Sequence, residues 1–212
     1  MQGRAYLLRP DTPKEGRERP QRPGETEDEL SEPLRSQAKD AGLIMRPARR
    51  TPNTLYALEA TEYAQQHGKF LEFHHAAYKA FWEDRQDIGE MEILHKVGHE
   101  VGLDADDMVK SLEEGIYAKE VMAQYQEALG YGISGIPTFL VGNLLFTGAQ
   151  PYETFKMAME RFLSEGVPSS SEEYPLLTCG KKARSRAGLF CLCRSLTVNL
   201  RRVLVSCWEL RL

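Results

Sequence analysis

The stretch IPTFLVGNLLFT, residues 136–147, constrains the fold more than any other part of the chain. Two short apolar runs, Thr138–Val141 and Leu144–Thr147, flank a Gly142-Asn143 pair, and this pattern predicts a β-hairpin. Pro137 has no N–H to give to a sheet, so it predicts the start of a strand rather than its interior. A hairpin alone cannot bury both faces, so the sequence predicts a larger sheet.

The rest of the folded part is predicted to be mostly helical. A short helix is predicted to begin at Asp104 or Asp106, which can cap it, and to end at Gly115. Another helix is predicted to begin near Pro52 and end at Gly68, because proline is common at the first helical position. After the hairpin, Pro151 and Glu153 open an amphipathic helix with Phe155, Met159 and Phe162 facing inward. Residues 9–25 are predicted to be loop. The helices before the hairpin are expected over residues 26–42, 52–68, 70–84, 89–101, 104–115 and 116–129.

Composition changes sharply near residue 167. Residues 167–178 are interpreted as a linker, and residues 179–212 as a basic tail that holds all four cysteines, Cys179, Cys191, Cys193 and Cys207. Their spacing lacks the Cys-x₂₋₄-Cys pairs of structural zinc sites, so no metal site is predicted. The tail either lies on an anionic membrane surface or forms no fixed structure, and it is unlike the sequence before it.

Several classes of function have no support in the sequence. No apolar stretch reaches the ~18 residues of a membrane-spanning helix, and residues 1–20 lack the apolar core of a secretory signal, so a cytoplasmic location is expected. The folded part has no phosphate-binding glycine loop, no nucleophile triad and no basic stripe for nucleic acid. No cofactor is expected, and the oligomeric state is open. His74 and His75 have no spaced partner ligands; one is expected to face solvent and the other to pack beside Phe70 and Tyr78.

The segment GISGIPTFLVGNLLFTGAQPYETFKMAME, residues 132–160, resembles the C-terminal half of the DsbA-like thioredoxin family, and in particular its FrnE-like branch. RTPNTLYAL and FWEDRQDIGEMEIL resemble the inserted helical domain of that branch, and LRPDTPKEG resembles the segment after its second strand. The resemblance covers about residues 5–166. It implies an α/β thioredoxin-like fold, incomplete at the N-terminus, with an inserted α-helical domain.

The resemblance also implies a domain organisation and a gap in it. Residues 1–25 would be a remnant of the second strand, at about Ala5–Leu8, followed by loop; 26–130 the inserted helical domain; 131–166 the C-terminal β-β-α half; and 167–212 the linker and tail. The family's first strand and Cys-x-x-Cys are absent from the chain, either because Met1 is a misplaced start or because this is a truncated relative. The hairpin should then either self-associate or recruit the tail around Leu196–Val205 as a substitute strand.

For the site, the resemblance implies a cis Ile136–Pro137 bond beside a substrate-binding segment, Ser134, Gly135, Ile136 and Pro137. The N–H and C=O of Ile136 would pair with an extended substrate, which would be a thiol- or disulfide-containing peptide, protein or small molecule. No catalytic residue is predicted. Ser134 is either a turn residue or a substrate contact, and Thr51 and Asn53 are either helix caps or substrate contacts. Two functions follow: a thiol–disulfide oxidoreductase or related isomerase that is redox-impaired in this chain, or a non-catalytic module that binds peptides.

Overall fold

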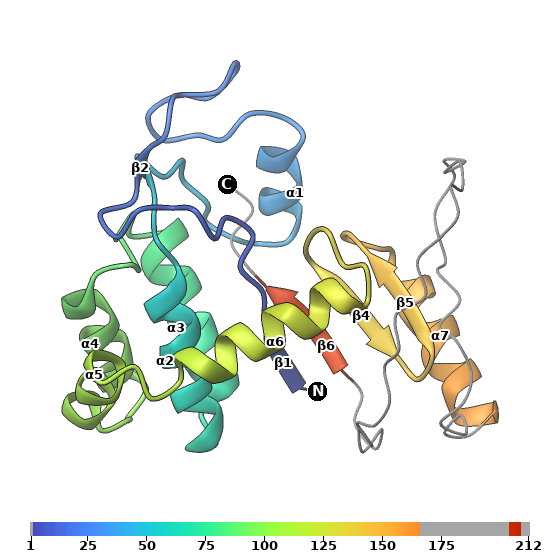
Figure 1. The fold of residues 1–212 in the computed structure, drawn as a ribbon. Helices are drawn as coiled ribbons and strands as arrows, with labels where there is room; N and C mark the ends of the chain where they lie inside the picture. Colours follow the sequence, from blue (N-terminus) through green and yellow to red (C-terminus); the bar gives the residue numbers. More distant parts are fainter. Residues whose placement is uncertain (1, 166–203, 209–212) are drawn as a thin grey trace. The chain divides into compact units, whose positions relative to one another are not determined.

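A computed structural model describes residues 2–165 and 204–208 (Figure 1). The described residues form two compact units, and the division falls between Tyr131 and Gly132. One unit holds residues 5–131 and is mainly helical; we call it the helical unit. The other holds residues 2–4, 132–165 and 204–208, and we call it the sheet unit.

The helical unit is built around one central helix, α2. This helix, Leu55–Gln66, packs against α3, α4, α5 and α6. Its core contains large side chains with almost no exposed surface, among them Tyr63, Phe73, Phe81 and Leu94. Burying such side chains is the main driving force for folding. The other helices are α1 (Leu34–Asp40), α3 (Phe70–Trp82), α4 (Met91–Glu100), α5 (Ala105–Glu113) and α6 (Ala118–Gly130).

Two helices begin later than the sequence pattern indicates. The helix predicted over 26–42 is only α1, because Pro33 is its N-cap residue and a proline disfavours helical backbone in the residue before it. Pro52 is not the first residue of α2, which begins at Leu55. Asp104 does cap α5, because its Oδ1 accepts the N–H of Asp107 at 3.0 Å.

Part of the predicted loop is a short antiparallel ribbon. Strand β2, Arg17–Glu18, pairs with β3, Arg50–Thr51, so that Arg17 lies opposite Thr51. The residues before this ribbon also pack against the helices. Ala5 and Leu7 are buried against Leu58 and Val121, and the Ala5 N–H donates to Gln124 Oε1 at 2.6 Å.

These contacts correct the predicted strand at Ala5–Leu8. The observed strand, β1, spans Gln2–Ala5 and overlaps the prediction only at Ala5. The reason is that the following apolar side chains, including Leu7, pack on the helices of the helical unit rather than on a sheet. These apolar residues are therefore buried, but only Ala5 belongs to a strand.

The sheet unit contains the predicted hairpin. Strand β4 (Thr138–Val141) pairs antiparallel with β5 (Leu144–Thr147), with Phe139 opposite Phe146. Helix α7 (Tyr152–Glu165) packs on this hairpin through Phe155, whose ring centroid lies 4.8 Å from that of Phe139 and 5.2 Å from that of Phe146. Met159 was predicted to face inward but is 37% exposed, because the neighbouring Ala158 takes the buried position.

The hairpin has a neighbour on its inner side. The strand order of the sheet is β1-β6-β4-β5, in which β6, Leu204–Trp208, is antiparallel to β4 (Figure 1). The tail therefore supplies a substitute strand as predicted, although β6 overlaps the predicted Leu196–Val205 segment only at its end. The remaining cysteines of the tail, Cys179, Cys191 and Cys193, lie outside the described residues, as does the predicted linker.

Gly142 at the hairpin turn gives a direct test of this packing. Its φ is +62°, and a Cβ added there would lie 2.7 Å from Cδ2 of Phe162. Left-handed backbone costs an L-residue about 1–2 kcal/mol, and displacing the packed Phe162 ring adds about 1 kcal/mol. We therefore expect Gly142→Ala to lower the free energy of unfolding by about 2–3 kcal/mol in urea titrations.

Gly102 provides the matched control for this substitution. Its φ is +76°, but an added Cβ meets nothing within 4 Å among the described residues. Gly102→Ala should therefore cost only the backbone term of about 1–2 kcal/mol. Equal losses in the two variants would show that Phe162 does not pack on the turn.

Candidate functional site

The segment Ser134–Pro137 joins the end of the helical unit to strand β4. Its Ile136–Pro137 peptide bond is cis. Two hydrogen bonds fix its position: the Thr138 hydroxyl donates to the Gly135 C=O at 2.7 Å, and the Gly148 N–H donates to the Pro137 C=O at 2.7 Å. The segment is thus held by the first residue of β4 and by the turn after β5.

The four predicted site residues differ in their exposure. The Ile136 side chain is buried, with 2% of its surface exposed, whereas Ser134 is exposed and Gly135 and Pro137 are half-buried. A Cβ built on Gly135 meets no described atom within 4 Å. Among the described residues, the backbone at Gly135 therefore has open space beside it. The predicted outward pairing of the Ile136 backbone stays a prediction.

The Asn53 side chain makes two hydrogen bonds to the backbone near the start of α2, so it has a structural role of the helix-cap kind. Its Oδ1 accepts the N–H of Leu55 at 3.0 Å, and its Nδ2 donates to the C=O of Thr12 at 2.7 Å. These bonds shape the entry into α2 and tie it to the loop before the ribbon. Thr51 belongs to β3 and pairs with Arg17, so it is not a cap of α2.

The two adjacent histidines behave as the sequence indicates. His74 packs beside Phe70 and Tyr78, with ring centroids at 5.7 and 4.5 Å, and His75 is exposed. Burial, aided by the nearby His75, lowers the pKa of His74 to about 4, so its imidazole is neutral at physiological pH. The described residues contain no cluster of three His, Cys, Asp or Glu side chains that could hold a metal ion.

Two groups of buried charged residues could not be recognised from the sequence pattern. The first is Glu59, which lies in α2 with 1% of its surface exposed, and whose Oε2 has no hydrogen-bond partner among the described residues. Burial alone raises its pKa from 4.5 to about 7. Glu59 lies within residues 57–64 of α2, all of which are buried in the structure.

The second group is an ion pair beside the ribbon. Arg19 and Glu25 are joined at 2.6 Å, and their side chains are only 8% and 1% exposed. Hydrogen bonding from the Arg19 guanidinium holds the pKa of the Glu25 carboxyl below its usual range. Nothing in the local pattern of residues 9–25 indicates burial, so this pair could not be found from the sequence.

Comparison with known proteins identifies a matching domain family and a similar curated protein. Residues 1–160 match the DSBA-like thioredoxin domain. The chain is 33% identical over 113 residues to the uncharacterized protein YwbO of Bacillus subtilis (strain 168), a match that covers 51% of this chain and 54% of that protein. The chain thus spans about half the length of this curated relative.

A solved structure supports the same fold. The probable DsbA oxidoreductase SCO1869 from Streptomyces coelicolor is 27% identical, with a TM-score of 0.57, over 72% of this chain and 66% of that one. The chain therefore has an α/β thioredoxin-like fold with a helical insertion. None of the helices in the described ranges is long and apolar enough to cross a membrane.

Proposed function

Because the chain belongs to the DSBA-like thioredoxin domain family, we propose that it is a redox-impaired member of the thiol–disulfide oxidoreductase superfamily. Its substrates would be thiol- or disulfide-containing peptides, proteins or small molecules. The motifs Gly-x-Ser-Gly-x-Pro and Gly-Ala-Gln-Pro, present at residues 132–137 and 148–151, favour the FrnE-like branch. A cytoplasmic location is part of the same proposal.

One observation carries the proposed impairment. Residues 1–178, which include all of the matched segment, contain no cysteine. Thiol–disulfide exchange proceeds by attack of a thiolate on a disulfide sulfur, so a domain without cysteine cannot form the mixed-disulfide intermediate. The cysteines of the protein are all in residues 179–207, at spacings that do not form Cys-x-x-Cys.

The proposal is tested by the rate at which the protein oxidises a dithiol peptide or reduces insulin. We expect neither the 212-residue protein nor a variant with all four cysteines replaced by serine to exceed the uncatalysed rate. Turnover that survives the four substitutions would contradict the requirement for a thiolate. Turnover that they abolish would also contradict the proposal, because it would assign redox activity to the tail.

A second candidate function is a non-catalytic module that binds extended peptides at Ser134–Pro137. The open space beside Gly135 supports it, since a peptide backbone can approach there without displacing a side chain. The hydrogen bonds from Thr138 and Gly148 support it as well, because they hold the segment in one conformation before a ligand arrives. This function needs no cysteine, so it is compatible with the loss of redox activity.

A further inference from the structure

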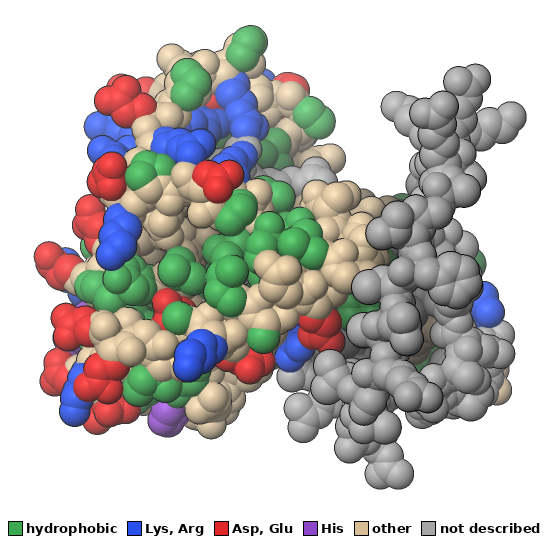
Figure 2. Space-filling model, viewed as in Figure 1, with side chains coloured by type: hydrophobic (Ala, Val, Ile, Leu, Met, Phe, Trp, Pro, Cys, Tyr) green, Lys and Arg blue, Asp and Glu red, His purple; other side chains and the backbone are tan. Residues whose placement is uncertain are grey.

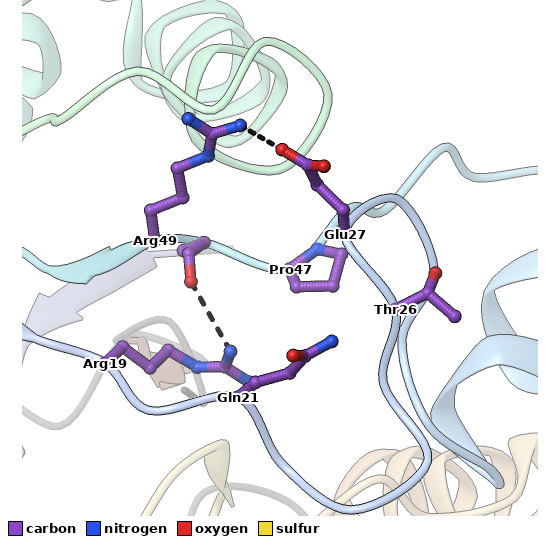
Figure 3. Close-up of a pocket in the computed structure, with 7 residues that line it drawn as sticks. Arg19, Gln21, Thr26, Glu27, Pro47 and Arg49 are labelled. Carbon is purple, nitrogen blue, oxygen red and sulfur yellow. Dashed lines mark hydrogen bonds and ion pairs between the residues drawn. The ribbon is translucent and has the colours of Figure 1, made fainter.

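A cavity of about 300 Å³ lies beside the β2–β3 ribbon, wholly within the helical unit. It takes no part in the proposed function. Polar side chains from two segments, residues 19–27 and 47–49, surround it (Figure 3). The residues that matter for its chemistry are Arg19, Gln21, Glu27 and Arg49.

The register of the ribbon places three arginines on one face. Arg17 lies opposite Thr51, and the backbone N–H of Arg19 donates to the C=O of Arg49 at 3.2 Å. Side chains alternate between the two faces of a strand, so Arg17, Arg19 and Arg49 share a face, and Arg50 lies on the other. Lys and Arg side chains gather over the part of the helical unit around β2 (Figure 2).

Arg19 forms a fixed part of the cavity wall. Its two terminal nitrogens donate to the two carboxylate oxygens of Glu25, at 2.9 and 2.6 Å. The Arg19 side chain is only 8% exposed as a result, and its Nε has no hydrogen-bond partner among the described residues. A buried donor without an acceptor is rare in folded proteins, so the Arg19 side of the cavity wall is incompletely satisfied within the described part of the chain.

Arg49 and Arg17 hold positive charge that is available to a ligand. Arg49 pairs with Glu27 at 2.5 Å, but both side chains are 72% exposed, and such exposed pairs contribute little stability. The Arg17 guanidinium donates to the backbone carbonyl oxygen of Asp11 and pairs with no carboxylate in the described ranges. The cavity lining therefore has one weakly engaged cation, Arg49, and Arg17, which is outside the lining but on the same face of the ribbon, is a second cation that no carboxylate neutralises.

We propose that this cavity binds a small oxyanion, in the form of a carboxylate or phosphate group. The ligand replaces Glu27 on Arg49, whose planar guanidinium matches the two oxygens of such a group, and Arg17 adds a second positive charge at its side. The buried Arg19–Glu25 pair contributes the rigid wall rather than net charge. Glu27 acts as an internal competitor for the same guanidinium.

Isothermal titration of the 212-residue protein with sodium phosphate, and separately with sodium succinate, tests this site. We expect saturable binding of at least one probe, and the two titrations distinguish a phosphate site from a carboxylate site. Arg49→Gln should weaken binding about tenfold, because it removes a charge-assisted hydrogen bond. Glu27→Gln should strengthen binding, because it removes the competing carboxylate.

Arg50→Gln is the matched control, since Arg50 neighbours Arg49 in the sequence but lies on the other face of the ribbon. It should leave the affinity unchanged. The proposal is overturned if neither probe gives saturable binding to the wild type or to Glu27→Gln. It is also overturned if Arg50→Gln weakens binding as much as Arg49→Gln, because the effect would then be one of general charge. Circular dichroism of each variant checks that the fold is retained.

Discussion

Replacing Glu25 by alanine is expected to lower the free energy of unfolding by about 3–5 kcal/mol. The carboxylate lies 2.6 Å from the Arg19 guanidinium, in a pair whose side chains are 8% and 1% exposed. It also accepts the N–H of Arg22 at 3.0 Å, which closes the turn between them. Its removal leaves the Arg19 charge buried without a counter-ion, and this desolvation penalty accounts for most of the loss.

Urea denaturation of a small set of variants measures this effect. The double variant Arg19→Met/Glu25→Leu should recover much of the stability, since it removes both buried charges. Glu27→Ala, in the exposed pair with Arg49, should cost less than about 1 kcal/mol. A loss for Glu25→Ala as small as that for Glu27→Ala would show that the Arg19–Glu25 pair is solvated.

The same pair makes a contribution that depends on pH. The pKa of Glu25 is lowered in the folded state from 4.5, so its stabilisation is complete above pH 4.5 and is lost as the pH falls through the lowered pKa. The wild type should therefore lose more stability on acidification than Glu25→Ala does.

Glu59 is expected to contribute the opposite dependence on pH, which Glu59→Gln removes. The pKa of Glu59 is raised by burial from 4.5 to about 7, so the folded state binds a proton more tightly than the unfolded state. Stability contributed by the neutral carboxyl is complete below pH 4.5 and is lost as the pH rises through 7. The full difference corresponds to at most about 3 kcal/mol, at about 1.4 kcal/mol for each pH unit.

Thermal unfolding at pH 5 and pH 8 separates this effect from a general one. Between pH 5 and pH 8 the unfolding midpoint of the wild type should decrease relative to that of Glu59→Gln, because both proteins share the opposite contribution of His74. Glu59→Gln should then be the more stable protein at pH 8. Glu113→Gln, at an exposed position of α5, should follow the wild type. Parallel curves for the wild type and Glu59→Gln would contradict the assignment of a raised pKa to Glu59.

Local features of the fold could be predicted because their causes are local. The hairpin at Gly142-Asn143 has the predicted strands because the turn residues and both apolar runs are adjacent in the sequence. Asp104 could be identified as a possible cap because its partner, the N–H of Asp107, is three residues away. The inward faces of Phe155 and Phe162 follow from helical periodicity, which fails only at Met159.

Features that depend on distant partners could not be predicted in the same way. The ribbon joins Arg17 to Thr51, and neither strand has an apolar pattern of its own. The end of β1 is set by the burial of Leu7 against Val121, which is far away in the sequence. The buried state of Arg19, Glu25 and Glu59 likewise depends on tertiary packing, because composition alone places such residues on the surface.

The candidate site at Ser134–Pro137 could be predicted only in part. The Ser134–Pro137 segment could be selected because of its family-like motif and its place before β4. The bond from Thr138 to Gly135 and the open space beside Gly135 required the structure. The anion-binding cavity could not be found from the sequence, because its arginines belong to two segments that only the ribbon brings together.

The most direct test of the account measures the binding and oxidation of one reduced peptide that carries a cysteine pair. Fluorescence anisotropy of a labelled peptide reports binding to the variant with four serines in place of cysteine, and a thiol assay reports oxidation. Gly135→Glu should be compatible with the fold, since a Cβ there meets nothing within 4 Å in the described part of the protein, but the long side chain would fill the open space. Gly130→Glu, which has equally open surroundings at the end of α6, is the matched control.

We expect saturable binding that Gly135→Glu weakens about tenfold or more, since the substitution would remove several backbone hydrogen bonds to the peptide. Gly130→Glu should bind as the parent does. We also expect no loss of thiols beyond that in buffer. Equal affinities for Gly135→Glu and Gly130→Glu, or catalysed oxidation of the peptide, would contradict these expectations.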